Sequence, residues 1–348
     1  MKFGETFTEY LHGDQEWFLE KCSHVEYKSL KKVLKTCRSC KPLGDSCKSE
    51  CQLCDQKFFS ELTKEASEIN GCFSSRVRHL LDLHVASGMQ GYLLRLRRYF
   101  KNDQQAMVLE GRMLVEYVTM NAIAIRKILK KYDKVHCSEN GRNFKSKLRA
   151  EHIELLQSPL LIELAAFYLS FNGEKKGEFN EFSSQFSCDF DATPPVMKLR
   201  LPHSIKLEYD LTCAVCLVRT FFSIAFWGNI FCFCPHSLIY VYLIMPSQDV
   251  VFNSYALSCG HLFCKSCACS SASVLIFQGL KTANPESKCP ICRQVGVYAK
   301  AVHMVELDML LKKRCKDYWK ERFAAERAET TKQSKEFWDA EAKYLIGY

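Results

Sequence analysis

The chain has 348 residues, of which 47% are hydrophobic and only nine are proline. These values argue against a disordered chain, and the length predicts about two to three domains. The formal net charge of +9 indicates an anionic partner, but it does not choose between nucleic acid, phosphate compounds and a membrane surface.

The N-terminal half predicts helices. Apolar side chains repeat at helical spacing over residues 3–11 and 27–35. Further helices are expected over residues 58–69, 76–84, 93–100, 107–132, 143–156 and 160–171. Pro159 separates the last two helices. No convincing strand alternation occurs before residue 195, so this half predicts a helical bundle.

One predicted helix is distinctive because its lysines share a face. Lys127, Lys130, Lys131 and Lys134 fall at i, i+3, i+4 and i+7 of the segment Ala124–Lys134. Four like charges on one face repel each other, so the arrangement costs stability unless an anion binds there. The opposite face is apolar and would be buried in the bundle.

Two sequence segments together resemble an SPX domain. The chain opens Met-Lys-Phe-Gly, continues Tyr-Lys-Ser-Leu-Lys-Lys from Tyr27, and carries Lys-Ile-Leu-Lys-Lys-Tyr-Asp-Lys from Lys127. SPX domains bind inositol polyphosphates and pyrophosphates on a basic surface, and so sense phosphate. The ligands that this resemblance implies are Tyr27, Lys31, Lys127, Lys131 and Lys134, with Lys2 and Lys130 as neighbours. The alternative is a solvated basic face, which is what most lysine runs form.

A thiol cluster lies in the expected loop between two of these helices. Its members are Cys37, Cys40, Cys47, Cys51 and Cys54. Two Cys-x2-Cys pairs can form a zinc ribbon, whereas free thiols are the alternative.

Residues 172–208 predict a linker. The segment Gly173–Glu178 is charged and rich in turn-forming residues, and Pro194 and Pro195 stiffen the end.

Four pairs of candidate metal ligands follow the linker. They are Cys213 with Cys216, Cys259 with His261, Cys264 with Cys267, and Cys289 with Cys292. A Cys-x2-Cys pair lets two thiolates reach one metal from a single turn, and two such pairs close a tetrahedral zinc site with Zn–S bonds of about 2.3 Å. Four pairs therefore make two sites.

This spacing, with one residue between Cys259 and His261, resembles the C3HC4 RING finger. The resemblance implies one zinc on the first and third pairs and another on the second and fourth. Cys269 is an alternative to Cys267, although the two-residue gap from Cys264 favours Cys267. Disulfides are the rival interpretation. Residues 1–5 lack the apolar segment of a secretory signal, so we expect an intracellular chain and metal binding.

An uncharged apolar run from Thr220 to Gln248 interrupts this module. It is long enough to span a membrane, which takes about 20 apolar residues, but a span would separate the ligands from one another. Without residues 218–249 the chain resembles an ordinary RING loop. We therefore favour a retained intron or gene-model error, with a genuine insertion as the alternative. The longer loop would cost only about 1.2 kcal/mol of closure entropy.

Three residues beside the ligands match positions through which similar RING fingers contact their partners. Val215 and Pro290 would contact the ubiquitin-conjugating enzyme (E2), and Arg293 would bridge the E2 and ubiquitin. An arginine suits this position because its planar fork can donate to two carbonyls at once. The alternatives are local packing for Val215 and Pro290, and a solvated surface charge for Arg293.

Residues 305–344 predict a long helix. Leu307, Leu310, Leu311, Cys315 and Tyr318 mark an apolar stripe along it. Such a helix would pack on the RING finger, pair with itself or hold a substrate.

An SPX domain followed by a RING finger resembles the plant nitrogen-limitation-adaptation type of ubiquitin ligase, over residues 1–217 and 250–348. The expected fold is a mainly α SPX bundle (1–171), a linker (172–208), a small zinc-stabilised α+β RING finger (209–295, containing 218–249) and a C-terminal helical segment (296–348).

The resemblance implies an E2-dependent E3 ubiquitin ligase that holds two Zn²⁺ and forms no covalent ubiquitin intermediate. Its regulatory ligand would be an inositol polyphosphate or pyrophosphate. Its substrates would be membrane phosphate transporters, with nitrate transporters as a further class, which places it in the cytoplasm at the plasma membrane, in the nucleus, or in both.

The remaining expectations concern association with other molecules. A homodimer is expected by analogy. No membrane span of its own and no nucleic-acid partner are expected, because the lysine helix offers only Tyr132 for base stacking. The alternative function is a non-catalytic SPX scaffold whose RING finger is disrupted by residues 218–249.

Overall fold

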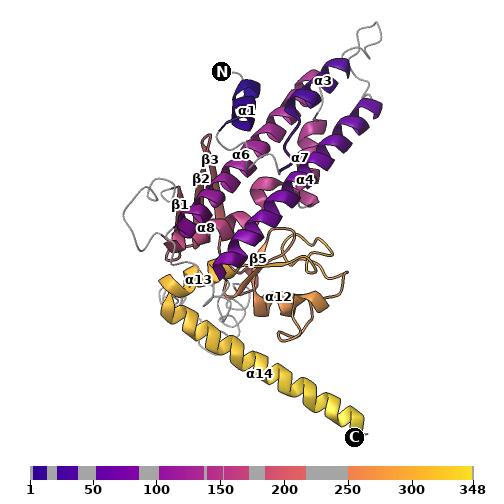
Figure 1. The fold of residues 1–348 in the computed structure, drawn as a ribbon. Coiled ribbons are helices and arrows are strands. Elements are labelled where there is room, and N and C mark those ends of the chain that lie inside the picture. Colours follow the sequence, from indigo (N-terminus) through magenta and orange to yellow (C-terminus); the bar gives the residue numbers. More distant parts are fainter. Residues whose placement is uncertain are drawn as a thin grey trace, which may run out of the picture. The chain divides into compact units, whose positions relative to one another are not determined.

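The computed structural model describes residues 3–13, 22–37, 52–85, 102–136, 139–151, 153–171, 185–216 and 250–346. The chain divides into two compact units (Figure 1). The first comprises Met1–Leu164 with Leu201–Ile205, and the second comprises Ala165–Arg200 with Lys206–Tyr348.

The first unit is a bundle of helices. Its elements are α1 (Phe3–Leu11), α3 (Tyr27–Cys37), α4 (Gln52–Val85), α6 (Asn102–His136), α7 (Asn140–Ala150) and a 3₁₀ turn (Leu155–Gln157). Helices α3, α4 and α6 pack against one another, and α7 packs on α6. The mainly α character predicted for this half is confirmed.

Helix α4 is continuous where two helices were expected. Phe58, Leu62, Ile69, Phe73 and Val77 are all fully buried, and their spacing stays in phase through the predicted gap at residues 70–75. The exposed Gly71 costs a helix only about 1 kcal/mol, which the burial of one phenylalanine offsets. Packing on α6 therefore keeps the helix continuous at Gly71.

The core between α4 and α6 centres on aromatic rings. Phe58 and Tyr132 are fully buried and stack with ring centroids 4.7 Å apart. The Tyr132 hydroxyl donates a hydrogen bond to the Asp55 carboxylate, so the polar end of this buried ring is satisfied. Tyr132, which was considered as a base-stacking residue, is therefore a core residue.

Glu65 of α4 makes the first unit sensitive to pH. Burial raises the pKa of this carboxyl to about 7, and the hydrogen bond from the Glu26 backbone N–H only partly offsets that effect. The folded protein therefore holds the Glu65 proton more tightly than the unfolded chain does. This stabilises the folded state at low pH, and the stabilisation is lost as the pH rises through about 7. We expect Glu65→Gln to raise the melting temperature at about pH 8 and to leave it unchanged at about pH 4. Calorimetry of both proteins at the two pH values checks this, and an equal shift at both would contradict it.

Helix α8 (Leu160–Phe171) begins directly after Pro159, as predicted, and the second unit continues with a three-stranded sheet. Its strands are β1 (Phe186–Asp189), β2 (Val196–Leu201) and β3 (Ile205–Asp210), in the order β1-β2-β3. Strands β1 and β2 are antiparallel, with Phe186 opposite Leu199.

The expectation of a linker is wrong for residues 185–208, because they form this sheet. The expectation of no strand before residue 195 is also wrong. Strand β1 has only four residues, so the alternation of its buried and exposed side chains is too short to stand out in the sequence. The limits of the predicted domains stay a prediction.

A second small sheet and a short helix follow. Strands β4 (Ser254–Ala256), β5 (Leu262–Cys264) and β6 (Val302–His303) form a sheet in the order β5-β4-β6. Helix α12 (Lys265–Ser271) follows β5 directly, and a 3₁₀ turn covers Leu280–Thr282. This mixture confirms the predicted small α+β module.

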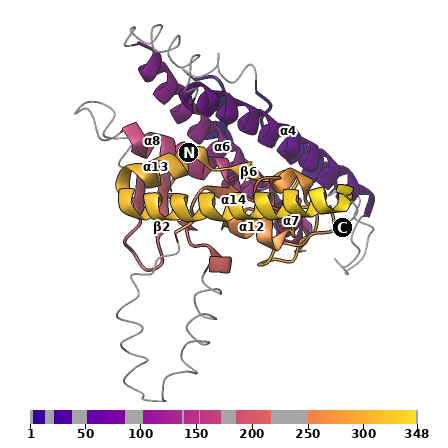
Figure 2. The same cartoon turned by 90° about the horizontal axis from the view of Figure 1, so that it is seen from below.

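The C-terminal segment forms two helices, α13 (Val305–Arg314) and α14 (Lys316–Ile346), which contact each other (Figure 2). The expected single helix is interrupted because Cys315 has φ −122° and ψ 60°, outside the helical region. Helix α13 buries Leu307, Leu310 and Leu311, whereas no residue of α14 is fully buried.

Several expectations fall outside the described residues. They are the helix at 93–100, the thiol cluster at Cys37–Cys54 and the apolar insert at 218–249. Within the described ranges, the structure contains no helix with the length and apolar character that crossing a bilayer requires.

Candidate metal centre

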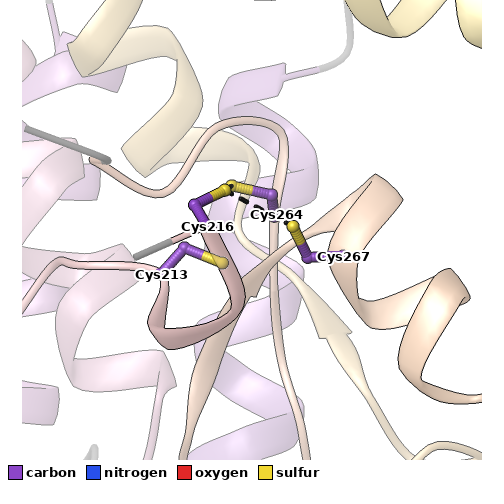
Figure 3. Close-up of side chains that lie close together, drawn as sticks. All are labelled: Cys213, Cys216, Cys264 and Cys267. Atoms are coloured by element: carbon purple, nitrogen blue, oxygen red, sulfur yellow. Dashed lines mark hydrogen bonds between the residues drawn. The ribbon is translucent and has the colours of Figure 1, made fainter. Parts of the chain in front are cut away.

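The first group of candidate ligands consists of four buried cysteines that converge from separate elements (Figure 3). Cys213 and Cys216 lie in the turn after Leu211, Cys264 ends β5, and Cys267 lies in the first turn of α12. Their sulfur atoms all lie within 4.8 Å of one another. The predicted pairing of the first and third ligand pairs is therefore the one that the fold brings together.

The geometry of this group fits a tetrahedral metal site. The Cys216 sulfur lies 3.8 Å from that of Cys264 and 3.4 Å from that of Cys267. A zinc ion with four Zn–S bonds of about 2.3 Å holds its sulfurs about 3.8 Å apart. All four cysteines are free thiols, so the donor set is that of a closed structural site.

Backbone pairing joins the described segments that precede and follow residues 217–249. Thr212 forms a β-bridge with Val250, and the Val251 N–H donates to the Leu211 carbonyl at 2.8 Å. The Phe252 N–H then donates to the Cys264 sulfur at 3.3 Å. The described residues before and after this segment are thus held together, and both ligand pairs of the first group keep their positions.

The second group combines three cysteines with a histidine. It consists of Cys259, His261, Cys289 and Cys292, whose ligand atoms also lie within 4.8 Å of one another. The His261 Nδ1 atom lies 3.3 Å from the Cys259 sulfur and 3.6 Å from the Cys289 sulfur. Gly260 between the first two has φ +85°, a conformation that favours glycine, so the one-residue gap turns both ligands toward the same point.

Hydrogen bonds between neighbouring thiols make at least one cysteine of each group more acidic than a free thiol. Hydrogen bonding from Cys259 is the largest effect on Cys289 and lowers its pKa to about 3. Hydrogen bonds from Cys216, Cys264 and Cys267 lower the pKa of Cys213 well below its usual range. Hydrogen bonds from neighbouring thiols, together with burial, instead raise the pKa values of Cys259, Cys264 and Cys267. Thiolates are the metal-binding form of cysteine, so a metal ion that binds either group would displace the remaining thiol protons.

The structure decides between the two candidate cysteines of α12. Cys267 lies in the first group, whereas Cys269 is buried outside both groups. Burial raises the pKa of Cys269 to about 11, which keeps its thiol neutral.

The three candidate partner contacts lie beside the ligand groups. Val215 is half-buried, whereas Pro290 and Arg293 are exposed. Sequence reasoning did not single out Ile291, whose side chain is 47% exposed between two ligands and adds apolar surface next to Pro290. Arg293 has φ +60°, and its N–H donates to the Cys289 carbonyl at 2.9 Å, so the ligand turn positions its backbone. The contacts of these residues with partners stay predictions.

In the first unit, the basic residues attributed to ligand binding lie on α3 and α6. The Lys127 ammonium lies 4.3 Å from the centre of the Phe3 ring, which meets the Tyr27 ring edge-on at 5.4 Å. Tyr27 and Lys127 are thus brought to the same aromatic ring, although they lie far apart in the sequence.

The other lysines extend this surface. Lys31, Lys130 and Lys134 are exposed, and Lys131 is half-buried. Among the described residues, no carboxylate lies within ion-pair distance of Lys31, Lys127, Lys130 or Lys134. The opposite face of the helix buries Ile128 and Leu129, as predicted. The role of these lysines as ligands stays a prediction.

One residue near the first group was missed by sequence reasoning. Arg322 of α14 donates through one guanidinium nitrogen to the Cys216 and Cys264 sulfurs, at 3.4 and 3.6 Å. It lies far from the ligands in sequence and belongs to no ligand-like motif, so only the fold reveals it.

The chain is similar along its whole length to several plant proteins, although no family model matches it. It is 57% identical over 366 aligned residues to "Probable E3 ubiquitin-protein ligase BAH1-like" of Arabidopsis thaliana, and 53% identical over 369 to "Probable E3 ubiquitin-protein ligase BAH1-like 1" of Oryza sativa subsp. indica. It is 39% identical over 367 residues to "E3 ubiquitin-protein ligase NLA" of Arabidopsis thaliana. Each alignment covers 100% of both proteins.

Proposed function

The chain belongs to the plant family of BAH1-like and NLA E3 ubiquitin-protein ligases, and from this premise we propose that it is a RING-type E3 ubiquitin transferase. The observation that carries the proposal is the pairing of eight ligands in two interleaved groups. Two zinc ions bound there would act as structural cross-links, and no other chemistry is required of them. The ligands are Cys213, Cys216, Cys264 and Cys267 for one ion, and Cys259, His261, Cys289 and Cys292 for the other.

The residues of this chain would act by binding and orientation. Val215, Pro290 and Ile291 offer apolar surface to an E2, and the exposed Arg293 can donate to the E2 and to ubiquitin together. A substrate amine would attack the thioester carbonyl between E2 and ubiquitin, an amide would form, and the E2 thiolate would leave. Holding the thioester in a reactive geometry accelerates this step without a covalent intermediate on the E3.

The lysine surface of the first unit supports a regulatory ligand. Lys31, Lys127, Lys130 and Lys134 are exposed and present positive charge that the described carboxylates do not neutralise, and Lys131 and Tyr27 lie on the same helices. A ligand with several phosphates can contact several of these ammonium groups at once. An inositol polyphosphate or pyrophosphate has this chemistry, in keeping with the resemblance to an SPX domain.

The resemblance also supplies the proposed biological role. By this resemblance, the ligase would act in phosphate and nitrogen homeostasis, on membrane phosphate transporters, with nitrate transporters as a further substrate class. Its site of action would be the cytoplasm at the plasma membrane, the nucleus or both, and a homodimer remains an expectation by analogy.

The paired backbone at the ends of the insert argues against the alternative of a disrupted RING finger. The bridge between Thr212 and Val250 lets residues 213–216 form their ligand turn whatever the length of the chain that follows. Removing residues 218–249 would leave Leu217 joined to Val250, which closes a short loop around Cys213 and Cys216.

An autoubiquitination assay tests the proposal. We expect the variant without Val218–Asp249 to form zinc-dependent ubiquitin chains, and Cys259→Ala in that background to abolish them, because it removes a ligand of the second group. The complete chain is assayed beside them. Activity of the complete chain would show that the insert is tolerated, whereas activity of the shortened chain alone would show that it inactivates the RING finger. Inactivity of both with a panel of E2 enzymes would favour the scaffold function instead.

A further inference from the structure

Helix α14 contacts the metal-binding module through a polar stripe. The stripe consists of Tyr318, Arg322, Glu326 and Gln333, which recur at helical spacing. The Tyr318 hydroxyl donates to the Val250 carbonyl at 2.7 Å, and the Glu326 carboxylate accepts from the Asn253 amide at 2.6 Å. The Gln333 side-chain oxygen accepts from the Ile276 N–H at 3.0 Å. The helix is therefore held by hydrogen bonds over several turns.

Two aromatic contacts lie beside this stripe. Trp319 meets Phe252 edge-on, with ring centroids 5.9 Å apart, and Phe337 meets Phe277 at 5.6 Å. The Trp319 indole N–H also donates to Asp308 at 3.1 Å. These contacts restrict the rotation of α14 about its axis and so aim Arg322 toward the first cysteine group.

Arg322 contacts the first group at two of its buried sulfurs. Its guanidinium lies 3.4 Å from the Cys216 sulfur and 3.6 Å from the Cys264 sulfur, and the Cys264 residue is fully buried. The same Cys264 sulfur also accepts the Phe252 N–H. One ligand thus receives both a backbone donor and a fixed positive charge.

The guanidinium of Arg322 can neutralise part of the negative charge of a metal site with four thiolate ligands. Zinc with four thiolates carries a net charge of about −2, which is costly to bury without a counter-charge. Arginine stays protonated in proteins, and a charged donor makes a stronger hydrogen bond to a charged sulfur. Outer hydrogen-bonding partners of metal ligands typically change metal affinity by about 10- to 100-fold.

We propose that Arg322 is the charge-neutralising hydrogen-bonding partner of the first metal centre, and that α14 is thereby an integral part of the RING module. This inference rests on the metal occupancy proposed above. Helix α14 would then contribute a hydrogen-bonding partner to the metal ligands. Its sequence had predicted only apolar packing, self-pairing or substrate binding.

The second group provides an internal reference. Among the described residues, no arginine or lysine side chain lies within hydrogen-bonding distance of the Cys259, Cys289 or Cys292 sulfurs. A change at Arg322 is therefore expected to act on one of the two metal ions and to leave the other unaffected.

The test is the rate at which the full-length protein loses zinc. Parent and variant, each loaded with Zn²⁺, are mixed with excess chelator, and the release is followed with a metallochromic dye. For Arg322→Met, we expect one of two zinc equivalents to leave about 10- to 100-fold faster than in the parent, and the other at the parent rate. Arg322→Lys keeps the charge but loses the planar fork, so an intermediate rate is expected.

Two further variants separate charge from helix docking. Arg327→Met removes an exposed arginine from the same helix, and Gln333→Ala removes a docking hydrogen bond without approaching a sulfur. Both are expected to release zinc as the parent does. Parent-like release from Arg322→Met, or equally fast release from Gln333→Ala, would overturn the role of Arg322. A parent protein that binds no zinc would overturn the metal sites themselves, and this inference with them.

Discussion

Replacing Cys264 by serine is expected to release one metal ion and to abolish ubiquitin transfer. Cys264 is fully buried at the end of β5, and its sulfur lies 3.8 Å from that of Cys216. Structural zinc contributes about 10–16 kcal/mol in small zinc domains, which is comparable to or larger than the whole stability of a typical domain, about 5–15 kcal/mol. Loss of one of the four ligands should therefore empty the first group and disorder the segments that it joins, while the second group keeps its ion. Zinc content per chain and autoubiquitination, both measured in the background without residues 218–249, check this result.

Cys269→Ser is the matched control for this variant. Cys269 is also a buried thiol, lies close by in the same segment, and belongs to neither ligand group. We expect it to keep two zinc ions and its activity, with at most a small loss of thermal stability. If Cys269→Ser lost a metal ion and Cys264→Ser kept both, the assignment of the first group would be wrong.

Replacing Lys31, Lys127 and Lys134 together by alanine is expected to weaken the binding of inositol hexakisphosphate by at least about 100-fold. A hydrogen bond to a charged group contributes about 1.5–3 kcal/mol, and three such contacts are removed. All three lysines are exposed on α3 and α6, so the bundle should remain folded. Isothermal titration calorimetry with the full-length protein measures the change, and circular dichroism checks the fold.

A second triple variant with the same change in net charge controls for unspecific attraction. Lys64, Lys145 and Lys147 lie in the same unit, and each is paired with a carboxylate at 3.5–4.0 Å. Their replacement by alanine should change the affinity only slightly, because their charges are already compensated. Equal weakening by both triple variants would mean that the lysines of α6 form an ordinary solvated basic face.

Ligand spacing was the most informative property of the sequence. Short gaps hold two ligands on one turn, so the chain has few ways to complete two tetrahedral sites, and the structure brings the eight predicted side chains together in the predicted pairing. The long helices were also predictable, because burial on one face imposes a period of 3.6 residues on α4 and α6.

Sequence reasoning failed where the elements are short. Strands β1, β2 and β3 have only four to six residues each, and although their burial alternates, the segment was mistaken for a linker because it also contains Pro194 and Pro195. The gap expected in α4 was wrong, because packing buries its apolar face throughout. The single C-terminal helix was also wrong, because the backbone at Cys315 is not helical.

By itself, then, the sequence determined the helical first half, the two ligand groups and the lysine-bearing helix face, because each of these follows from spacing along the chain. Only the tertiary structure decided that Thr212 meets Val250 across the insert and that Arg322 reaches two sulfurs. These last features depend on hydrogen bonds and distances between residues remote in sequence. Such contacts leave no periodic pattern, so no property of the linear chain could have revealed them.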